Sequence, residues 1–196
     1  DIKAMQQSSP KEIADFIWLG QRVMREIESI PLPVISVIQG FAIGGGLELA
    51  LAADILIAST KARIGQAEVN LGLIPGFGGT QRLATRIGEG GAKRLVMTGE
   101  IIAGEEAYRL GVVDFLVAPE LLEEKVKEVA SGILAKSPKA VAAGKEVVAR
   151  HFAEAKLAGL TAEAEAFLEL FASAEAKEGI AAFVEKRSPN FLLKRD

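Results

Sequence analysis

The chain has 196 residues, of which 49% are hydrophobic and 25% charged, and its net charge is -3. A chain of this length can bury a core without covalent staples, and its interspersed charges leave no basic stripe for a nucleic acid or an anionic membrane. Because it has no cysteine and one histidine, we expect no disulfide framework, no Cys/His metal site and an intracellular location, in the cytoplasm or, in a eukaryote, the mitochondrial matrix.

The N-terminal part of the sequence predicts a long amphipathic helix. The chain opens at Asp1 without a Met, a basic segment or an apolar signal segment, which indicates a truncated N-terminus. From Pro10 to Ser29 apolar residues recur at helical spacing, and Ser9 followed by proline suits a helix N-cap. We therefore expect one helix over residues 10–29.

A buried strand and a glycine turn come next. The β-branched run Val34 to Ile38 predicts a strand buried on both faces, in a parallel sheet covered by helices. Even with its continuation through Phe41 to Ile43, this run is far shorter than the roughly 20 residues that a membrane span needs. It leads into glycines 44–46, and strong helix formers follow at 47–53. We expect a strand, a tight turn and a helix N-terminus in succession.

The remaining pattern alternates short strands and helices before it becomes helical. We expect further strands at 54–59, 62–65 and 112–117, a loop at 66–68, and helices at 81–87, 92–97 and 105–110. From Pro119 onward the pattern is helical, with breaks near Pro138, Gly159 and Gly179. The sequence thus predicts an α/β core over residues 1–118 and a helical region over 119–196.

The glycine turn is the first feature that could carry chemistry. A helix N-terminus presents unpaired N–H groups, and glycine lets a ligand oxygen approach them closely. Glu48 lies three residues after Gly45, on the same helical face. The pattern has a purely structural interpretation too, since the helix dipole alone favours a glutamate there. Spacing along the chain does not place the loop residue Glu68 beside Glu48.

Two longer segments resemble the signatures of the crotonase (enoyl-CoA hydratase/isomerase) superfamily. The first runs from Pro33 to Asp54 and contains Gly-Gly-Gly-Leu-Glu-Leu, and the second runs from Ile64 to Leu83. The likeness continues to residues 182–191, so it covers essentially the whole chain. One departure is Ala67, which stands where relatives usually have a proline before the second glutamate.

The resemblance implies a fold and a domain organisation. It predicts a crotonase-like spiral of ββα units, with residues 1–118 forming the C-terminal part of its core. Residues 119–196 would be a helical oligomerisation region that forms homotrimers or homohexamers, with the apolar faces around residues 157–171 at the interface. By this resemblance, we expect the sequence to lack about a quarter of the family's length at the N-terminus.

The resemblance also implies an activity. It predicts an enoyl-CoA hydratase of the fatty-acid β-oxidation type, which adds water syn to a 2-trans-enoyl-CoA thioester and gives a 3-hydroxyacyl-CoA. Gly45 would supply an oxyanion-hole N–H, and Glu48 and Glu68 would be the paired catalytic acids. No cofactor is implied, because coenzyme A is part of the substrate. The substrate-binding residues implied are Asp1, Ile2, Lys3, Gly44, Gly45, Pro75, Gly76 and Lys186.

Two alternatives remain open at this stage. An enoyl-CoA isomerase, or another crotonase-type reaction on an acyl-CoA, would use the same fold and needs no water. A non-catalytic assembly subunit or RNA-associated paralogue would keep the fold alone. The presence of both glutamates favours hydration, because many relatives with other reactions keep only one.

Overall fold

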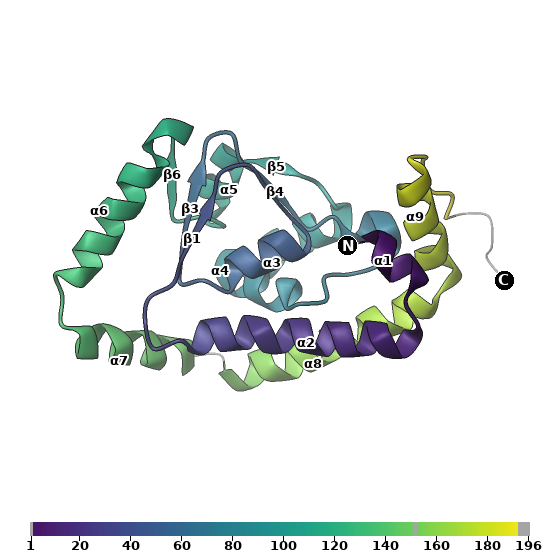
Figure 1. Cartoon of the computed structure of the whole chain (residues 1–196), viewed down its shortest axis with the longest axis horizontal. Coiled ribbons are helices and arrows are strands. Elements are labelled where there is room, and N and C mark those ends of the chain that lie inside the picture. Colours follow the sequence, from purple (N-terminus) through teal and green to yellow (C-terminus); the bar gives the residue numbers. More distant parts are fainter. Residues whose placement is uncertain (1, 151–152, 192–196) are drawn as a thin grey trace.

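The computed structural model describes residues 2–150 and 153–191 and has an α/β architecture (Figure 1). The strands are β1 (Ile35–Ile38), β2 (Phe41–Ile43), β3 (Ile55–Ser59), β4 (Arg63–Gly65), β5 (Ile102–Ala103) and β6 (Phe115–Val117). The α-helices are α1 (Ile2–Gln7), α2 (Pro10–Ser29), α3 (Gly45–Leu51), α4 (Gly79–Thr98), α5 (Gly104–Leu110), α6 (Leu122–Leu134), α7 (Pro138–Ala149), α8 (Ala153–Ala172) and α9 (Ala174–Glu185). Two 3₁₀ helices, η1 (Glu68–Leu71) and η2 (Pro119–Leu121), complete the described elements.

The strands form two small sheets that arise from repeated ββα units. In the first sheet, β1, β3 and β6 run parallel, and Ile35 lies opposite Ile55. In the second, β2 pairs in parallel with β4, and β5 joins β4 antiparallel. The units β1-β2-α3 and β3-β4-α4 each give their first strand to one sheet and their second strand to the other. The chain therefore advances as a spiral, as expected.

The helix at residues 10–29 is confirmed, together with its N-cap. The Ser9 hydroxyl accepts from the Glu12 N–H, and the Glu12 side chain accepts from the Ser9 N–H, which completes a capping box. Several predicted boundaries were wrong. The strand expected to run into residues 41–43 is two strands in different sheets, and β5 was not predicted. The predicted helices 81–87 and 92–97 are one helix, α4, with a kink at Gly88.

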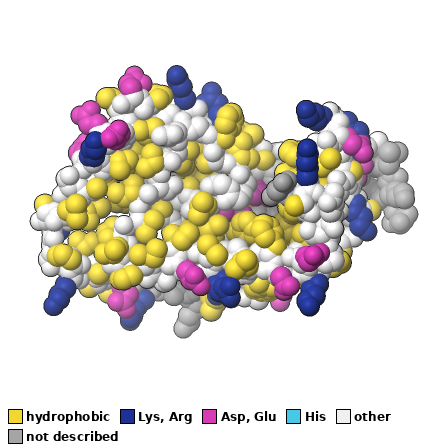
Figure 2. Space-filling model, in the orientation of Figure 1, with side chains coloured by type: hydrophobic (Ala, Val, Ile, Leu, Met, Phe, Trp, Pro, Cys, Tyr) yellow, Lys and Arg dark blue, Asp and Glu magenta, His cyan; other side chains and the backbone are white. Residues whose placement is uncertain are grey.

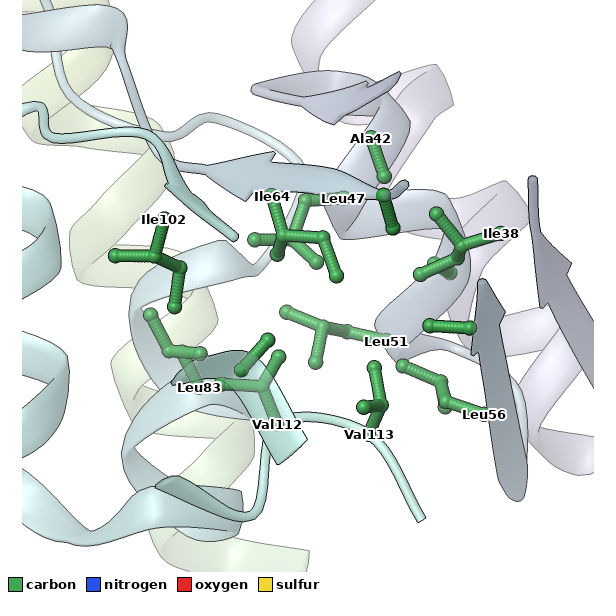
Figure 3. Close-up of a cluster of buried hydrophobic side chains, with 14 of the residues drawn as sticks. Ile38, Ala42, Leu47, Leu51, Leu56, Ile64, Leu83, Ile102, Val112 and Val113 are labelled. Carbon is green, nitrogen blue, oxygen red and sulfur yellow. The ribbon is translucent and has the colours of Figure 1, made fainter. Parts of the chain in front are cut away.

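Two apolar clusters hold the molecule together. The first lies between the two sheets and helices α3, α4 and α5, and Figure 3 shows its side chains converging. Leu47, Leu56 and Ile64 are fully buried in it. Because α3 inserts Leu47 and Leu51 into this core, the glycine turn before α3 is held in place. The second cluster joins α2, α8, α9 and the segment 71–77.

The C-terminal helices pack against the N-terminal helix. In Figure 1, α2 and α8 run side by side, and the two helices are in contact. Leu160, Ala164 and Phe167 of α8 are buried within the same chain, so this part of residues 157–171 packs inside the chain and not at the subunit interface where we expected it. The expected breaks near Gly159 and Gly179 were wrong, because both glycines lie inside helices; only the break before Pro138 is present. Within the described residues, no helix is long and apolar enough to cross a membrane.

Candidate active site

A cavity of about 840 Å³ lies between α1, α2, the turn before α3, η1 and the ends of α8 and α9. Figure 2 shows a hollow on this side of the molecule, with acidic side chains visible inside it. The wall is mostly apolar and includes Phe16, Phe77 and Phe167. Gly44, Gly45, Glu48 and Glu68 also line it, so the residues of the predicted chemistry meet in one place.

Glu48 is fixed by the backbone of a distant turn. It lies on α3, its side chain is almost fully buried, and its Oε1 atom accepts hydrogen bonds from the N–H groups of Phe77, at 2.7 Å, and Gly79, at 2.8 Å. Gly79 has no side chain to block this approach, since a Cβ there would stand 3.0 Å from Oε1. The other oxygen, Oε2, lies 4.0 Å from the position of a Cβ on Gly45. One carboxylate oxygen is thus held by backbone, and the other lies beside the glycine turn.

Glu68 begins η1 rather than lying in an irregular loop. Its Oε1 atom lies 3.0 Å from the position that a Cβ on Gly44 would take. In the amide orientation that satisfies its hydrogen bonds, buried Gln66 donates to both oxygens of Glu68, at 3.1 and 3.0 Å. The preceding Ala67 has φ -103°, outside the narrow range near -65° that a proline imposes.

Burial gives both carboxyls unusual proton affinities. It raises the pKa of Glu48 to about 8, with a further contribution from the negative charges of Glu163 and Glu68. Burial also raises the pKa of Glu68 to about 7, and the Glu163 charge adds to this effect. Near neutral pH the pair can therefore hold one proton and one negative charge, which suits a general acid and a general base.

The glycine turn presents backbone to the cavity. Gly44 has φ +56°, its N–H donates to the Gly65 carbonyl at 2.9 Å, and its own carbonyl accepts from Leu47 and Glu48. Gly45 is the first residue of α3, so no helical carbonyl one turn earlier can accept its N–H. The Glu48 carboxylate lies close to Gly45, so a ligand oxygen that accepts this N–H would also lie near Glu48.

The other predicted binding residues are not all at the cavity. Ile2, Lys3 and Gly76 line it. Pro75 is buried next to Gly76 but is not part of the wall, and Asp1 lies outside the described residues. Lys186 is exposed at the end of α9, and it is Phe183, one turn earlier, that reaches the cavity.

Sequence reasoning missed a third buried carboxylate near the site. Glu163 of α8 is 3% exposed, and it influences the pKa of both Glu48 and Glu68. Its position was detectable, because it falls three residues after Leu160 and four before Phe167, on the apolar stripe of α8. Among residues 2–150 and 153–191, no group of three or more His, Cys, Asp or Glu side chains is arranged to hold a metal ion.

Comparison with known proteins identifies the fold family. The enoyl-CoA hydratase/isomerase family profile matches residues 1–194. The chain is 45% identical to a crotonyl-CoA hydratase of Syntrophomonas wolfei, over 99% of this chain and 75% of that protein. It is 43% identical to a short-chain-enoyl-CoA hydratase of Clostridium acetobutylicum, over 95% of this chain and 72% of that protein.

Solved structures agree with the sequence relatives. An enoyl-CoA hydratase from Mycobacterium avium subsp. paratuberculosis superposes with a TM-score of 0.86 at 30% identity, over 91% of this chain and 73% of that one. An enoyl-CoA hydratase from Bacillus anthracis superposes with a TM-score of 0.73 at 39% identity, over 93% of this chain and 71% of that one. The crotonase-like architecture is therefore confirmed, and the chain belongs to the enoyl-CoA hydratase/isomerase family.

Proposed function

We propose that the protein is an enoyl-CoA hydratase, a lyase that adds water syn across the double bond of a 2-trans-enoyl-CoA and gives a 3-hydroxyacyl-CoA. One observation carries this proposal: Glu48 and Glu68, which come from different elements, line one cavity together with the Gly45 backbone. Hydration needs a base for water, an acid for the α-carbon and a donor for the thioester oxygen. These three groups supply one of each.

The reaction begins with a water molecule between the two carboxyls. The ionised carboxyl takes a proton from the water as the water oxygen bonds to the β-carbon. The π electrons of the double bond shift toward the thioester, and the protonated carboxyl then delivers its proton to the α-carbon. The pair ends with one proton, as it began. Because the pKa of Glu68 is about 7 and that of Glu48 about 8, Glu68 is the ionised carboxyl that activates the water and Glu48 the protonated carboxyl that delivers the α-proton, although the two roles can be exchanged.

The Gly45 N–H stabilises the negative charge that develops on the thioester oxygen. A backbone donor at a helix start is preorganised, so it costs no rearrangement as the charge appears. Removing one such donor costs about 10²–10³-fold in kcat in other enzymes. The cavity wall is mostly apolar, which strengthens this hydrogen bond by excluding water.

The substrate itself provides coenzyme A, so the reaction requires no separate cofactor. Lys3 lines the cavity, and we assign to it a contact with the CoA phosphate or ribose; Ile2, Gly44 and Gly76 contribute to the binding surface. Lys186 keeps only a peripheral role in CoA binding, because it is exposed outside the cavity wall. The names of the Syntrophomonas and Clostridium relatives support a short acyl chain.

The decisive experiment compares Glu48→Gln, Glu68→Gln and a control, Glu105→Gln, which alters an exposed residue of α5. Hydration of crotonyl-CoA is followed by the loss of the enoyl thioester absorbance. Each site variant should lose about 10²–10⁴-fold in kcat, because general acid or base catalysis contributes that much. Near-normal turnover by both site variants would contradict the assignment of Glu48 and Glu68 as catalytic residues. A 3-enoyl-CoA assay separates hydration from the double-bond shift of an isomerase.

Assembly and location complete the proposal. Residues 119–196 form the region that we assign to trimer and hexamer contacts, and exposed apolar side chains there, such as Leu134, Val148 and Leu157, support this. A single monomeric species in sedimentation equilibrium would contradict this assembly.

We place the protein in the cytoplasm or the mitochondrial matrix; a human relative is named as mitochondrial.

A further inference from the structure

Glu163 is a buried carboxylate that the mechanism above does not use. It lies on α8, far along the chain from the two catalytic glutamates, and its side chain is almost fully excluded from solvent. Its Oε1 atom accepts from the Gly78 N–H, and its Oε2 atom accepts from the Thr80 N–H at 2.9 Å and from the Thr80 hydroxyl. The Gln21 amide on α2 is a further donor, at 3.4 Å. The carboxylate thus has a complete set of partners.

The partners of Glu163 alternate with those of Glu48. Residues Phe77 to Thr80 form the turn at the start of α4, and all four donate their backbone N–H groups to these carboxylates. Phe77 and Gly79 donate to Glu48, whereas Gly78 and Thr80 donate to Glu163. The two carboxylates therefore bind one turn through alternate N–H groups, and neither can shift without moving the backbone that binds the other.

We propose that Glu163 is a positioning residue, which fixes the turn 77–80 so that the turn fixes the catalytic Glu48. The inference rests on the proposed function, because it gives Glu163 a role in hydration through Glu48. It also assigns a task to the C-terminal helical region beyond subunit contacts, since α8 carries Glu163 to the site.

A purely structural cap for α4 would not need a charge. Ser, Thr or Asn satisfies free N–H groups at a helix start without burying a carboxylate. Burial raises the pKa of Glu163, and its charge lies close enough to Glu48 to disfavour ionisation there. The charged groups that face it are Glu48 from α3, Glu68 from η1 and Arg82 from α4, of which the arginine alone favours its ionised form.

The substitution Glu163→Gln tests the charge and the geometry together. Glu163 uses both oxygens as acceptors, so a glutamine must turn its NH₂ group toward one of the two backbone donors. Glu48 differs, because a single oxygen accepts both of its hydrogen bonds. The matched control is Glu165→Gln, two residues along the same helix at an exposed position.

The first readout is steady-state hydration of crotonyl-CoA by the full protein. We expect Glu163→Gln to lower kcat by about 10²-fold, as displacement of a reacting group by about 1 Å does, with a much smaller change in KM. Glu165→Gln should match the wild type. A Glu163→Gln enzyme with wild-type kcat overturns the proposal.

The second readout does not depend on activity. Carboxyl-¹³C labelling of glutamates allows the titration of Glu48 to be followed by NMR, with its resonance assigned by its loss in Glu48→Gln. Glu163→Gln should move the Glu48 titration to lower pH, because a nearby negative charge is removed. A reduced kcat with an unmoved Glu48 titration shows a merely structural role and also overturns the proposal.

These readouts separate the two claims. If the wild type does not hydrate crotonyl-CoA, the proposed function fails, and the titration still decides whether Glu163 is coupled to Glu48. If Glu163→Gln does not fold, Glu163→Asp replaces it, since aspartate keeps the charge but is one methylene shorter. The expected result is then a Glu48 titration close to the wild type with a lower kcat, and an unchanged kcat counts against the inference.

Discussion

The Glu68 carboxylate lies directly against the position that a side chain on Gly44 would take: its Oε1 atom is 3.0 Å from the position of a Cβ there. Gly44 also has φ +56°, a backbone conformation that residues with a side chain rarely adopt. The approach of Glu68 to the turn before α3 therefore depends on the absence of a side chain at residue 44.

The substitution Gly44→Ala should damage both activity and stability. The added methyl group pushes the Glu68 carboxylate aside by a few tenths of an ångström, so we expect kcat to fall by less than the roughly 10²-fold that a misplacement of about 1 Å costs. The strained backbone should lower the free energy of unfolding by about 1–3 kcal/mol. Gly46→Ala is the matched control, because a Cβ there has nothing within 4 Å and φ is not positive. Crotonyl-CoA turnover and urea unfolding measure both effects, and equal results for the two variants would contradict the prediction.

Part of the site could be predicted from local sequence. Gly45 and Glu48 are three residues apart at a helix start, so helical periodicity alone brings them together. Glu68 could not be placed in this way, because its position depends on the parallel pairing of β2 with β4, which brings the segment after β4 to the turn after β2. The meeting of Glu68 with Glu48 was implied only by the resemblance to a known family.

Other features required tertiary information for a physical reason. The split between β1 and β2 arises at Gln39-Gly40, where the chain leaves one sheet and enters the other; hydrophobic periodicity does not change there. Helical glycines at 159 and 179 were predicted as breaks because glycine weakens helices. In the structure, a Cβ on Gly179 would stand 2.5 Å from the Leu71 backbone, so this glycine permits close packing instead.

The two catalytic carboxyls predict a bell-shaped pH dependence of kcat/KM. Burial raises the pKa of Glu68 to about 7 and that of Glu48 to about 8. Below the lower value both carboxyls are protonated and no base remains, whereas above the higher value both are ionised and no acid remains. We expect the maximum of kcat/KM between these two pKa values. Both sides of the profile report the titration of the two carboxyls as a coupled pair. Initial rates with crotonyl-CoA at low substrate concentration measure the profile; a rate independent of pH from about 6 to 9 would count against the pair.

Burial of Glu48 also predicts that the wild type loses stability as pH rises. The pKa of Glu48 is raised from 4.5 to about 8, so the folded state binds more protons than the unfolded state between these values. The free energy of unfolding therefore falls as the pH rises from 4.5 to about 8. Glu48→Gln lacks this loss and keeps an oxygen for the Phe77 and Gly79 N–H groups.

We therefore expect Glu48→Gln to exceed the wild type in free energy of unfolding by little near about pH 5. The excess grows to the order of 3–5 kcal/mol above pH 8, at 1.36 kcal/mol per pH unit. Urea unfolding at both pH values measures it, with exposed Glu105→Gln as the control. Equal stability of Glu48→Gln and the wild type at alkaline pH would show that Glu48 is not held in a high-pKa environment.

The last prediction concerns the ion pair behind the turn 77–80. The Arg82 guanidinium, which is almost fully buried, donates to both oxygens of Glu28, at 3.0 and 2.9 Å, and to the Phe77 carbonyl at 2.6 Å. Lys156 also pairs with Glu28, so Glu28→Gln leaves two cations facing each other. Breaking such a buried pair costs about 3–5 kcal/mol of unfolding free energy, and we expect a value near the lower end because Glu28 keeps some exposure.

The control is Glu26→Gln, which should change the free energy of unfolding by less than about 1 kcal/mol, since the pair of Glu26 with Arg22 is largely exposed. Denaturant unfolding of the two variants tests the contrast, and a cost for Glu28→Gln as small as that for Glu26→Gln would mean that the buried arginine does not need its partner.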